Sequence, residues 1–347
     1  MPEQNCAVIL AAGEGKRMKA NRPKVLSPVL FKPMLEWVMD SAHAAGVKDL
    51  CVVAGYMHER VEQFLARYNG ANAGSIPVAH VLQAERKGTG HAVMMADAFL
   101  REHSGGNVLI LNGDAPFVGP DVISDALEEH CKSGNSVTVV TAELEDATGY
   151  GRIVRDPQTH LVSAIVEHKD ADEETRKIRE INSGAYWFRV DDLLDILYQI
   201  KNDNVQGEYY LTDAVKLMIS RGKPAAAFTS SDTSAVLGAN DCLQLNELNT
   251  IARDRVLNRH MAAGVEIPCC DGVIIGPDVV VGNDTCILPG TVLRGKTSVG
   301  NYCTLGPNTM LTDCNVGDHT TLNCVLGEGC TVPSGSSVAP FTVLQRQ

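Results

Sequence analysis

The sequence predicts an α/β domain with a mostly parallel sheet, followed by a short parallel β-helix. Two observations support this prediction. In residues 1–240, short apolar runs such as CAVILAAG and NVLILNGD alternate with amphipathic helical patterns such as PMLEWVMDSAHAAG, and this alternation is typical of a parallel sheet with helices on both faces. From residue 264 onward, aliphatic residues recur about every six positions, as they do in hexapeptide β-helices.

The composition is that of an ordinary folded protein. The chain has 347 residues, 44% of them apolar, and its 42 acidic and 30 basic side chains give a net charge of -12. This acidic balance argues against sequence-independent binding to nucleic acid or to an anionic membrane. The sequence has no apolar run long enough to span a bilayer and no signal-peptide pattern at its start, so we expect a cytoplasmic protein.

The elements of the α/β domain follow from the apolar pattern. Continuous apolar runs predict buried strands at residues 6–13, 50–56, 107–114, 136–144 and 185–190. Amphipathic patterns between them predict helices at residues 33–46, 91–103 and 121–134. Leucines at near-helical spacing among many charges predict a further, exposed helix at residues 242–263. This last helix would link the α/β domain to the β-helix.

Twelve aliphatic residues form the six-residue ladder, and nine of their eleven spacings are six residues. They are Val281, Ile287, Leu293, Val299, Leu305, Leu311, Val316, Leu322, Leu326, Val332, Val338 and Leu344. Two positions before each lies Val279, Thr285, Thr291, Thr297, Cys303, Thr309, Cys314, Thr320, Cys324, Cys330, Ser336 or Thr342. Each side of a triangular coil takes one large and one small inward side chain, so we expect roughly four coils.

The ladder also accounts for several of the eleven cysteines. No CxxC pair occurs, and Cys303, Cys314, Cys324 and Cys330 stand at the small position of the repeat. We therefore expect small, buried, free thiols in a reducing compartment rather than disulfides or a metal site.

The stretch LAAGEGKRMKANRPK, residues 10–24, reverses the charge of the chain. It has five cations and one anion, Glu14, directly after an apolar run. It matches neither the GxGxxG fingerprint nor the GxxxxGK[ST] loop. The stretch could be only a tight turn between a strand and a helix. Alternatively, Ala12, Gly13 and Gly15 let backbone N–H groups approach a polyphosphate while Arg17 and Lys24 supply positive charge.

Eight motifs in this order resemble a known family. LAAGEGKRMKANRPKVL is similar to the signature of sugar-1-phosphate nucleotidyltransferases, and it is followed by QAERKGTGHA, NGDAPF, TGYGRI, IVEHKD, EINSGAY, GEYYLTD and GAND. This order resembles bacterial N-acetylglucosamine-1-phosphate uridylyltransferases. The resemblance implies a Rossmann-like nucleotidyltransferase domain at residues 1–240, a linking helix at 241–263 and a left-handed β-helix at 264–347. It also implies a homotrimer assembled through the β-helix.

The resemblance assigns roles to residues around a nucleotide. Arg17, Lys24 and Asp114 would be catalytic. Gln83 with Gly88 and Thr89 would read uracil, although Thr89 could equally be the N-cap of a helix. The remaining nucleotide-binding positions implied by the family are Leu10, Ala11, Ala12, Gly13, Gly15, Lys24, Asn112 and Gly113.

The resemblance also implies a magnesium ion and a sugar site. Asp114 and Asn240 would hold Mg²⁺, which takes few hard oxygen ligands from protein and fills the rest with phosphate and water. A turn residue and a helix N-cap are the alternatives for these two positions. Gly151, Glu167 and Asn182 would contact the sugar, or each could be structural; Tyr209, Thr212 and Asp213 are left unassigned.

The activity that the resemblance implies is transfer of UMP from UTP to N-acetylglucosamine 1-phosphate, with UDP-N-acetylglucosamine and pyrophosphate as products. A different sugar 1-phosphate, such as glucose 1-phosphate, or a non-catalytic regulatory role are the alternatives. Two positions depart from the family: Asn112 stands where a tyrosine is usual, and Lys16 replaces a common threonine.

Relatives in this family also carry an acetyltransferase in the later coils of the β-helix. Here three residues follow Leu344, and the basic side chains from Gly264 onward are few and scattered. They are Arg294, Lys296, His319 and Arg346. Binding the phosphates of coenzyme A and positioning a base would need more of them. We therefore expect no acetyltransferase activity.

Overall fold

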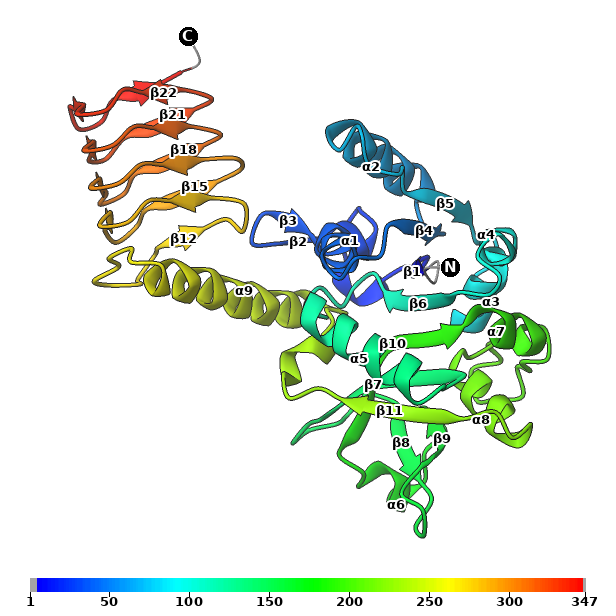
Figure 1. The fold of residues 1–347 in the computed structure, drawn as a ribbon. Helices are drawn as coiled ribbons and strands as arrows, with labels where there is room; N and C mark the ends of the chain where they lie inside the picture. The colour runs from blue at the N-terminus through cyan, green and yellow to red at the C-terminus, as the bar shows by residue number, and fades with distance from the viewer. Residues whose placement is uncertain (1–4, 346–347) are drawn as a thin grey trace. The chain divides into compact units, whose positions relative to one another are not determined.

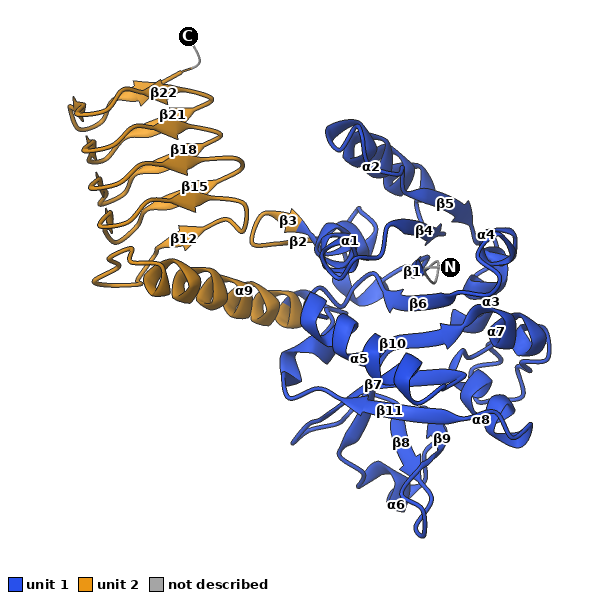
Figure 2. Ribbon diagram, viewed as in Figure 1, with its two compact units in different colours: residues 1–27, 33–242 blue, residues 28–32, 243–347 orange. Residues whose placement is uncertain are grey.

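The computed structural model describes residues 5–345 (Figure 1), and its internal contacts divide the chain into two compact units (Figure 2). Unit 1 comprises Met1–Ser27 and Pro33–Cys242, and unit 2 comprises Pro28–Lys32 and Leu243–Gln347. By their contacts, residues 28–32 therefore belong with the C-terminal part of the chain. Arg346, counted above among the basic side chains, lies outside the described residues.

Unit 1 is built on a nine-stranded sheet with the order β11-β7-β10-β6-β1-β4-β5. Its centre is β1 (Cys6–Ala11), which pairs in parallel with β4 (Asp49–Ala54) and β6 (Asn107–Asn112). Next to β4 lies β5 (Ala79–Leu82), also parallel. The continuous apolar runs of β1, β4 and β6 therefore form buried parallel strands, as the sequence predicts, whereas β5 is largely exposed and was not predicted.

The other half of the sheet is mixed. The long strand β10 (Glu180–Arg189) runs antiparallel to both β6 and β7 (Val137–Glu143), while β11 (Ala225–Thr229) is parallel to β7. A hairpin of β8 (Arg152–Arg155) and β9 (Val162–Val166) joins β10 at its side. The predicted mostly parallel sheet is confirmed, with β10 as the main antiparallel strand.

Helices cover both faces of this sheet (Figure 1), and the strands divide their side chains between two cores. Cys6 and Val8 of β1 face one core, whereas Ala7 and Ile9 face the other, because successive side chains of a strand point to opposite faces. The first core is closed by α3 (Thr89–Met95), α4 (Asp97–Glu102), α7 (Val190–Leu197) and α8 (Thr212–Ser220). The second is closed by α1 (Met34–Ala44), α2 (His58–Ala71) and α5 (Pro120–Lys132).

The helix predicted over residues 91–103 is interrupted. It forms α3 and α4, which meet at Ala96 with φ -89° and ψ 12°. The short elements of unit 1 are the 3-10 turns η1 (Lys16–Met18), η2 (Lys24–Leu26) and η3 (Thr233–Val236), and the helix α6 (Glu173–Arg176). The two-residue strands β2 (Pro28–Val29) and β3 (Lys32–Pro33) form a separate hairpin.

Unit 2 contains α9 (Cys242–Ala262) and a parallel β-helix. Although we expect an exposed helix here, α9 buries Leu248, Ala252, Val256, Leu257 and His260. The first side of the β-helix stacks β12 (Ile274–Ile275), β15 (Val292–Arg294), β18 (Met310–Thr312), β21 (Leu326–Glu328) and β24 (Val343–Leu344). The second stacks β13 (Val280–Val281), β16 (Ser298–Val299), β19 (Asn315–Val316) and β22 (Thr331–Val332). The third stacks β14 (Cys286–Ile287), β17 (Thr304–Leu305), β20 (Thr321–Leu322) and β23 (Ser337–Val338).

The predicted ladder is wrong at one step. Gly327, rather than Leu326, stands in register with Leu311 and Leu344, and Leu326 is 47% exposed. Val325 is buried at the small position, while Cys324 lies in a turn with φ +52°. The periodicity selects large aliphatic residues, so it overlooks a glycine at the inward position. The space that a side chain would fill there is taken by neighbouring sulfurs: a Cβ on Gly327 would lie 3.2 Å from Sγ of both Cys314 and Cys330.

All eleven cysteines lie within the described residues and are free thiols, as expected. Cys303, Cys314 and Cys330 are buried inside the coils, and Cys6 and Cys51 are buried in unit 1. The expectation of burial fails for Cys131, Cys242, Cys269 and Cys270, which are exposed. Between residues 5 and 345, no helix has both the length and the apolar character needed to cross a bilayer.

Candidate active site

Two adjoining pockets open at the carboxyl ends of β1 and β6, where open α/β sheets bind their ligands. The glycine-loop pocket, of about 480 Å³, is lined by Leu10, Ala12, Gly13, Glu14, Lys16, Lys24, Val25, Gln83, Arg86, Gly88, Thr89, Ala92, Asn112, Asp114 and Glu208. The hairpin pocket, of about 260 Å³, is lined by Leu10, Thr89, Asn112, Asp114, Ala115, Gly149, Tyr150, Gly151, Glu167, Asn182, Ser183, Gly184, Tyr186, Leu211, Thr212, Val236, Gly238 and Asn240. Leu10, Thr89, Asn112 and Asp114 line both pockets and mark their boundary.

The glycine-rich loop after β1 is shaped by the conformation of Gly15. This residue has φ +63°, and a Cβ on it would lie 2.7 Å from Cβ of Lys24, so a glycine is needed for the loop to fold against the lysine. Ala12 and Gly13 line the pocket. Ala11 is instead buried in the core. Among residues 5–345, Arg17 is exposed and lines neither pocket.

Lys24, Asp114 and Asn240 form a polar cluster at the boundary of the two pockets. The Lys24 ammonium forms an ion pair with the Asp114 carboxylate and donates to Asn240 Oδ1 at 3.0 Å. The Lys24 and Asp114 side chains are only 13% and 21% exposed. Two hard oxygens from distant segments thus converge on one positive group. The same pair of oxygens suits a divalent cation that takes its other ligands from phosphate and water.

Gln83 follows β5 and is 3% exposed. Its Nε2 donates to the Gly88 carbonyl at 3.0 Å and lies 3.0 Å from Nδ1 of His91. Gly88 has φ +104° and precedes α3, and a Cβ on it would lie 2.6 Å from the Tyr209 carbonyl. Thr89 is the first residue of α3 rather than its N-cap, and its Oγ1 accepts from the Leu211 amide.

Asn112 and Gly113 end β6 in different ways. The Asn112 side chain packs against Gly184, where a Cβ would lie 1.9 Å from Asn112 Nδ2. Gly184 has φ +79°, so this contact and this backbone conformation both require glycine. Gly113 is not in either lining; its amide donates to the Leu10 carbonyl at 2.9 Å. It therefore ties β6 to β1 beside the boundary residues.

Gly151, Glu167 and Asn182 meet in the hairpin pocket. Thr212 Oγ1 donates to Glu167 Oε1 at 3.3 Å. Burial raises the pKa of Glu167; the Thr212 hydroxyl opposes this, and the carboxylates of Asp170, Asp213 and Glu208 add to the rise. Asn182 is fixed at both ends of its amide, because Nδ2 donates to the Tyr186 hydroxyl at 2.6 Å and Oδ1 accepts from the Gly184 amide at 3.0 Å.

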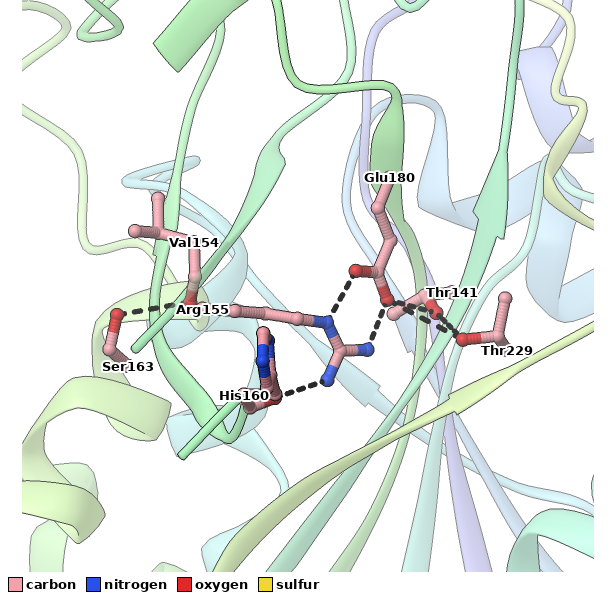
Figure 3. Close-up of polar contacts among 7 residues, drawn as sticks. All are labelled: Thr141, Val154, Arg155, His160, Ser163, Glu180 and Thr229. Carbon is pink, nitrogen blue, oxygen red and sulfur yellow. Dashed lines mark hydrogen bonds and ion pairs between the residues drawn. The ribbon is translucent and has the colours of Figure 1, made fainter. Parts of the chain in front are cut away.

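The β8–β9 hairpin, which carries Gly151 and Glu167 at its ends, is tied to the sheet by a polar cluster (Figure 3). Arg155 Nε and Nη2 donate to the two oxygens of Glu180, at 2.7 and 2.6 Å. Glu180 also accepts from Thr141 Oγ1 at 2.9 Å, and Arg155 Nη1 donates to the His160 carbonyl at 2.9 Å. The two-point contact between Arg155 and Glu180 holds the hairpin in a defined orientation against β10.

Several lining residues escaped the sequence analysis. Glu14 pairs with Arg86 at 3.2 Å and with Lys16 at 3.8 Å beside the glycine-loop pocket. Arg86 also lies over the Tyr56 ring, 5.6 Å from its centroid. The charge run gave a signal for Lys16, but nothing in QAERKG separates Arg86 from an ordinary solvated arginine. Thr212, within GEYYLTD, is a lining residue that the sequence left unassigned.

The position of these polar groups at the strand ends places the chain among α/β enzymes that bind nucleotides at the carboxyl edge of the sheet. Comparisons with known proteins agree. Residues 6–245 match the nucleotidyl transferase family, and residues 278–313 match the bacterial transferase hexapeptide family, described as six repeats.

Among the similar curated proteins is the bifunctional protein GlmU of Caldanaerobacter subterraneus subsp. tengcongensis, 41% identical over 98% of this chain and 71% of the relative. The bifunctional protein GlmU of Exiguobacterium sibiricum is 40% identical over 98% of this chain and 74% of the relative. The chain therefore belongs to the nucleotidyl transferase family and, within it, to the GlmU proteins. The predicted family and nucleotidyltransferase class are confirmed.

A solved structure shares the fold at low sequence identity. It is a Bacillus anthracis protein in complex with sucrose, described provisionally as a glucose-1-phosphate thymidylyltransferase. The TM-score is 0.58 with 20% identity, over 72% of this chain and 96% of that one. The curated relatives are named bifunctional, so their names give no support to the expectation that acetyl transfer is absent.

Proposed function

We propose that this chain transfers UMP from UTP to N-acetylglucosamine 1-phosphate, forming UDP-N-acetylglucosamine and releasing pyrophosphate. The observation that carries the proposal is the Lys24–Asp114–Asn240 cluster between two pockets. A nucleotide in one pocket and a sugar phosphate in the other would bring their phosphates together at this cluster.

The glycine-loop pocket suits the nucleotide. Ala12, Gly13 and Lys24 line this pocket, so backbone amides of the loop and the Lys24 ammonium could contact phosphates. The Gln83 amide lines the same pocket and is buried and held in place, so it can read a base edge. Arg17, which lines neither pocket, would act on the triphosphate only through movement of its exposed side chain.

The hairpin pocket suits an N-acetylated sugar. The Glu167 carboxylate can accept from two sugar hydroxyls. The Asn182 amide is already fixed by Tyr186 and Gly184. Its second N–H and the remaining lone pair of its oxygen therefore have a fixed direction. Gly151 leaves room in the wall, where a Cβ would lie 3.5 Å from Glu167 Oε2. Glucose 1-phosphate remains the rival substrate.

The reaction needs no protein nucleophile, because the sugar phosphate is already deprotonated near neutral pH. One of its oxygens forms a bond to the α-phosphorus of UTP, while the bond from that phosphorus to the bridging oxygen of the pyrophosphate breaks in line. The Lys24 ammonium neutralises negative charge at the junction of the pockets. Asp114 and Asn240 would hold Mg²⁺, which supplies further charge neutralisation and orients the phosphates.

The test is pyrophosphate release from a grid of nucleoside triphosphates and sugar 1-phosphates, with and without magnesium. We expect UTP with N-acetylglucosamine 1-phosphate to give the highest kcat/KM, and chelation to stop release. A preference for glucose 1-phosphate would support the rival transferase. No release from any pair would favour a non-catalytic role.

We also propose that the β-helix assembles copies of the chain into a homotrimer. Outward residues on one side of the coils form a stripe, because Met310 pairs with Leu326 and Leu326 with Val343. All three are exposed, at 37%, 47% and 57%. Packing such flat sides against further copies would bury this apolar surface. Sedimentation equilibrium should give three times the chain mass; a monomer at micromolar concentration would contradict the proposal.

A further inference from the structure

The main chain of Gln83 has one hydrogen-bonding partner in the protein, and its side-chain amide has two. Its backbone N–H donates to the Ala54 carbonyl at 2.8 Å, which fixes the main chain at the end of β5. Its side-chain Nε2 lies 3.0 Å from the Gly88 carbonyl and 3.0 Å from Nδ1 of His91 in α3. Both contacts are within hydrogen-bonding distance, so the amide is held in one orientation.

The chemistry of the partners fixes which end of the amide points where. The Gly88 carbonyl can only accept a hydrogen bond, so the amide atom beside it must be the nitrogen. That nitrogen has two protons, and the second can be donated to His91 Nδ1, which lies 3.0 Å away and acts as the acceptor in this arrangement. Both donors of Gln83 are thus used within the protein, which leaves Oε1 as the amide atom available to a ligand in the glycine-loop pocket that Gln83 lines.

An acceptor at this position distinguishes pyrimidine bases. Uracil has an N–H at position 3, which can donate to Oε1, whereas cytosine has a lone pair there, which Oε1 would repel. We propose that His91 is a positioning residue for base selection: by accepting from Gln83 Nε2, it keeps Oε1 toward the base and so favours uracil over cytosine. This inference rests on the proposed function, in which Gln83 lies at the base.

Loss of the acceptor at residue 91 would free one amide proton of Gln83. The amide could then turn a donor toward the pocket and accommodate the cytosine lone pair. The Gly88 contact alone holds one proton but leaves the other without a partner. Discrimination should therefore weaken without loss of the phosphate contacts, which involve Lys24 and the glycine-rich loop.

The experiment compares two substitutions of His91 by their kcat/KM for UTP and CTP. In His91→Leu the bulk is retained but the acceptor is removed; in His91→Asn the Oδ1 atom can take the place of Nδ1. We expect His91→Leu to lower the UTP/CTP ratio about tenfold, within the range for leaving a buried polar group unpaired. For His91→Asn, we expect the logarithm of the UTP/CTP ratio to be at least half of its wild-type value.

5-Methyl-UTP provides the internal control, because it has the same N–H as UTP at position 3. The ratio of UTP to 5-methyl-UTP should stay unchanged in both variants. A purely structural role of His91 would lower kcat/KM for all three nucleotides together and leave the ratios unchanged, and that outcome overturns the inference. Equal loss of the UTP/CTP ratio in the Leu and Asn variants overturns it as well.

Failure of the inference and failure of the proposed function give different results. A wild-type enzyme that shows no preference for UTP would contradict both. A wild-type enzyme that prefers UTP, with an unchanged ratio in His91→Leu, contradicts only the role of His91. If His91→Leu does not fold, as judged by circular dichroism, His91→Ala tests the same expectation, because residue 91 is only partly buried.

Discussion

Lys24 Nζ donates to Asn240 Oδ1 at 3.0 Å across 216 residues of sequence. The same ammonium pairs with Asp114 at the end of β6. Three segments that are remote in the chain are therefore joined at one polar point, between the glycine-loop pocket and the hairpin pocket. Any change of charge at this point should affect turnover more strongly than folding.

We expect Asp114→Asn to lower kcat by roughly 100-fold or more, since it removes the anionic oxygen of the cluster. The measurement is the initial rate of pyrophosphate release at saturating UTP, sugar phosphate and magnesium. Asp121→Asn, an exposed carboxylate at the start of α5, is the matched control and should behave as wild type. A rate for Asp114→Asn near that of the control would remove Asp114 from the catalytic site.

A second prediction concerns pH. Burial raises the pKa of Glu167, so its protonated form accumulates at a higher pH than for an ordinary glutamate. In the proposed sugar site, the carboxylate is the form that would accept from sugar hydroxyls. KM for the sugar 1-phosphate should therefore increase as the pH falls toward the raised pKa, while KM for UTP follows a different profile. In Glu167→Gln this acid-side rise of the sugar KM should disappear; its persistence would assign it to another group.

The same shift predicts an effect on stability. The folded state binds a proton at Glu167 more tightly than the unfolded state does, so stability falls as pH rises from the ordinary glutamate pKa through the raised one. At neutral pH the buried carboxylate is therefore a cost. Glu167→Gln should raise Tm at pH 7 relative to wild type and show a smaller difference at pH 4. An equal difference at both pH values would contradict the linkage.

The sequence predicted those parts of the fold that depend on local pattern. The apolar runs of β1, β4 and β6 and the amphipathic α1 and α5 were found because burial on one or both faces leaves a direct trace in the sequence. The direction of β10 was not predictable, since an apolar run is the same for a parallel and an antiparallel strand. The break at Ala96 was missed because the hydrophobic pattern continues through it.

Contacts between distant residues were the harder part. Most of the residues that the family resemblance suggested do line one of the two pockets, but the partners that orient them gave no signal. Arg155 and Glu180 look like ordinary charges of exposed strand ends in the sequence, yet they join two strands. The role of Asn112 was also unpredictable, because it packs against Gly184, which lies where the register of β10 shifts between Asn182 and Tyr186.

A fourth prediction follows from the Arg155–Glu180 contact. Arg155→Gln leaves the Glu180 carboxylate, which is 13% exposed, without its two-point partner. We expect a loss of about 1–2 kcal/mol in the free energy of unfolding. Because the hairpin carries Gly151 and Glu167, KM for the sugar phosphate should rise while KM for UTP stays constant. Lys177→Gln, which breaks an exposed pair with Glu174, is the control and should change neither.

These two readouts separate positioning from general destabilisation. An unstable but correctly shaped enzyme would show a lower rate whichever of the two substrates is varied, because the fraction of folded protein falls. A misplaced hairpin would raise KM for the sugar phosphate alone. Equal effects on the two KM values at a temperature well below Tm would contradict the proposed role of Arg155.

The last prediction tests the register of the β-helix at Gly327. A Cβ at this position would lie 2.8 Å from Leu311 Cδ2 and 3.2 Å from two sulfurs inside the coil. Gly327→Ala should therefore destabilise unit 2 by about 1–3 kcal/mol through overpacking. Gly70→Ala is the matched control: Gly70 lies within α2 and a Cβ there meets nothing within 4 Å, so alanine should stabilise by up to about 1 kcal/mol. The two substitutions are chemically identical and should have opposite signs in thermal unfolding. If Leu326 were the inward residue instead, Gly327 would face solvent, and Gly327→Ala would leave the unfolding of unit 2 almost unchanged.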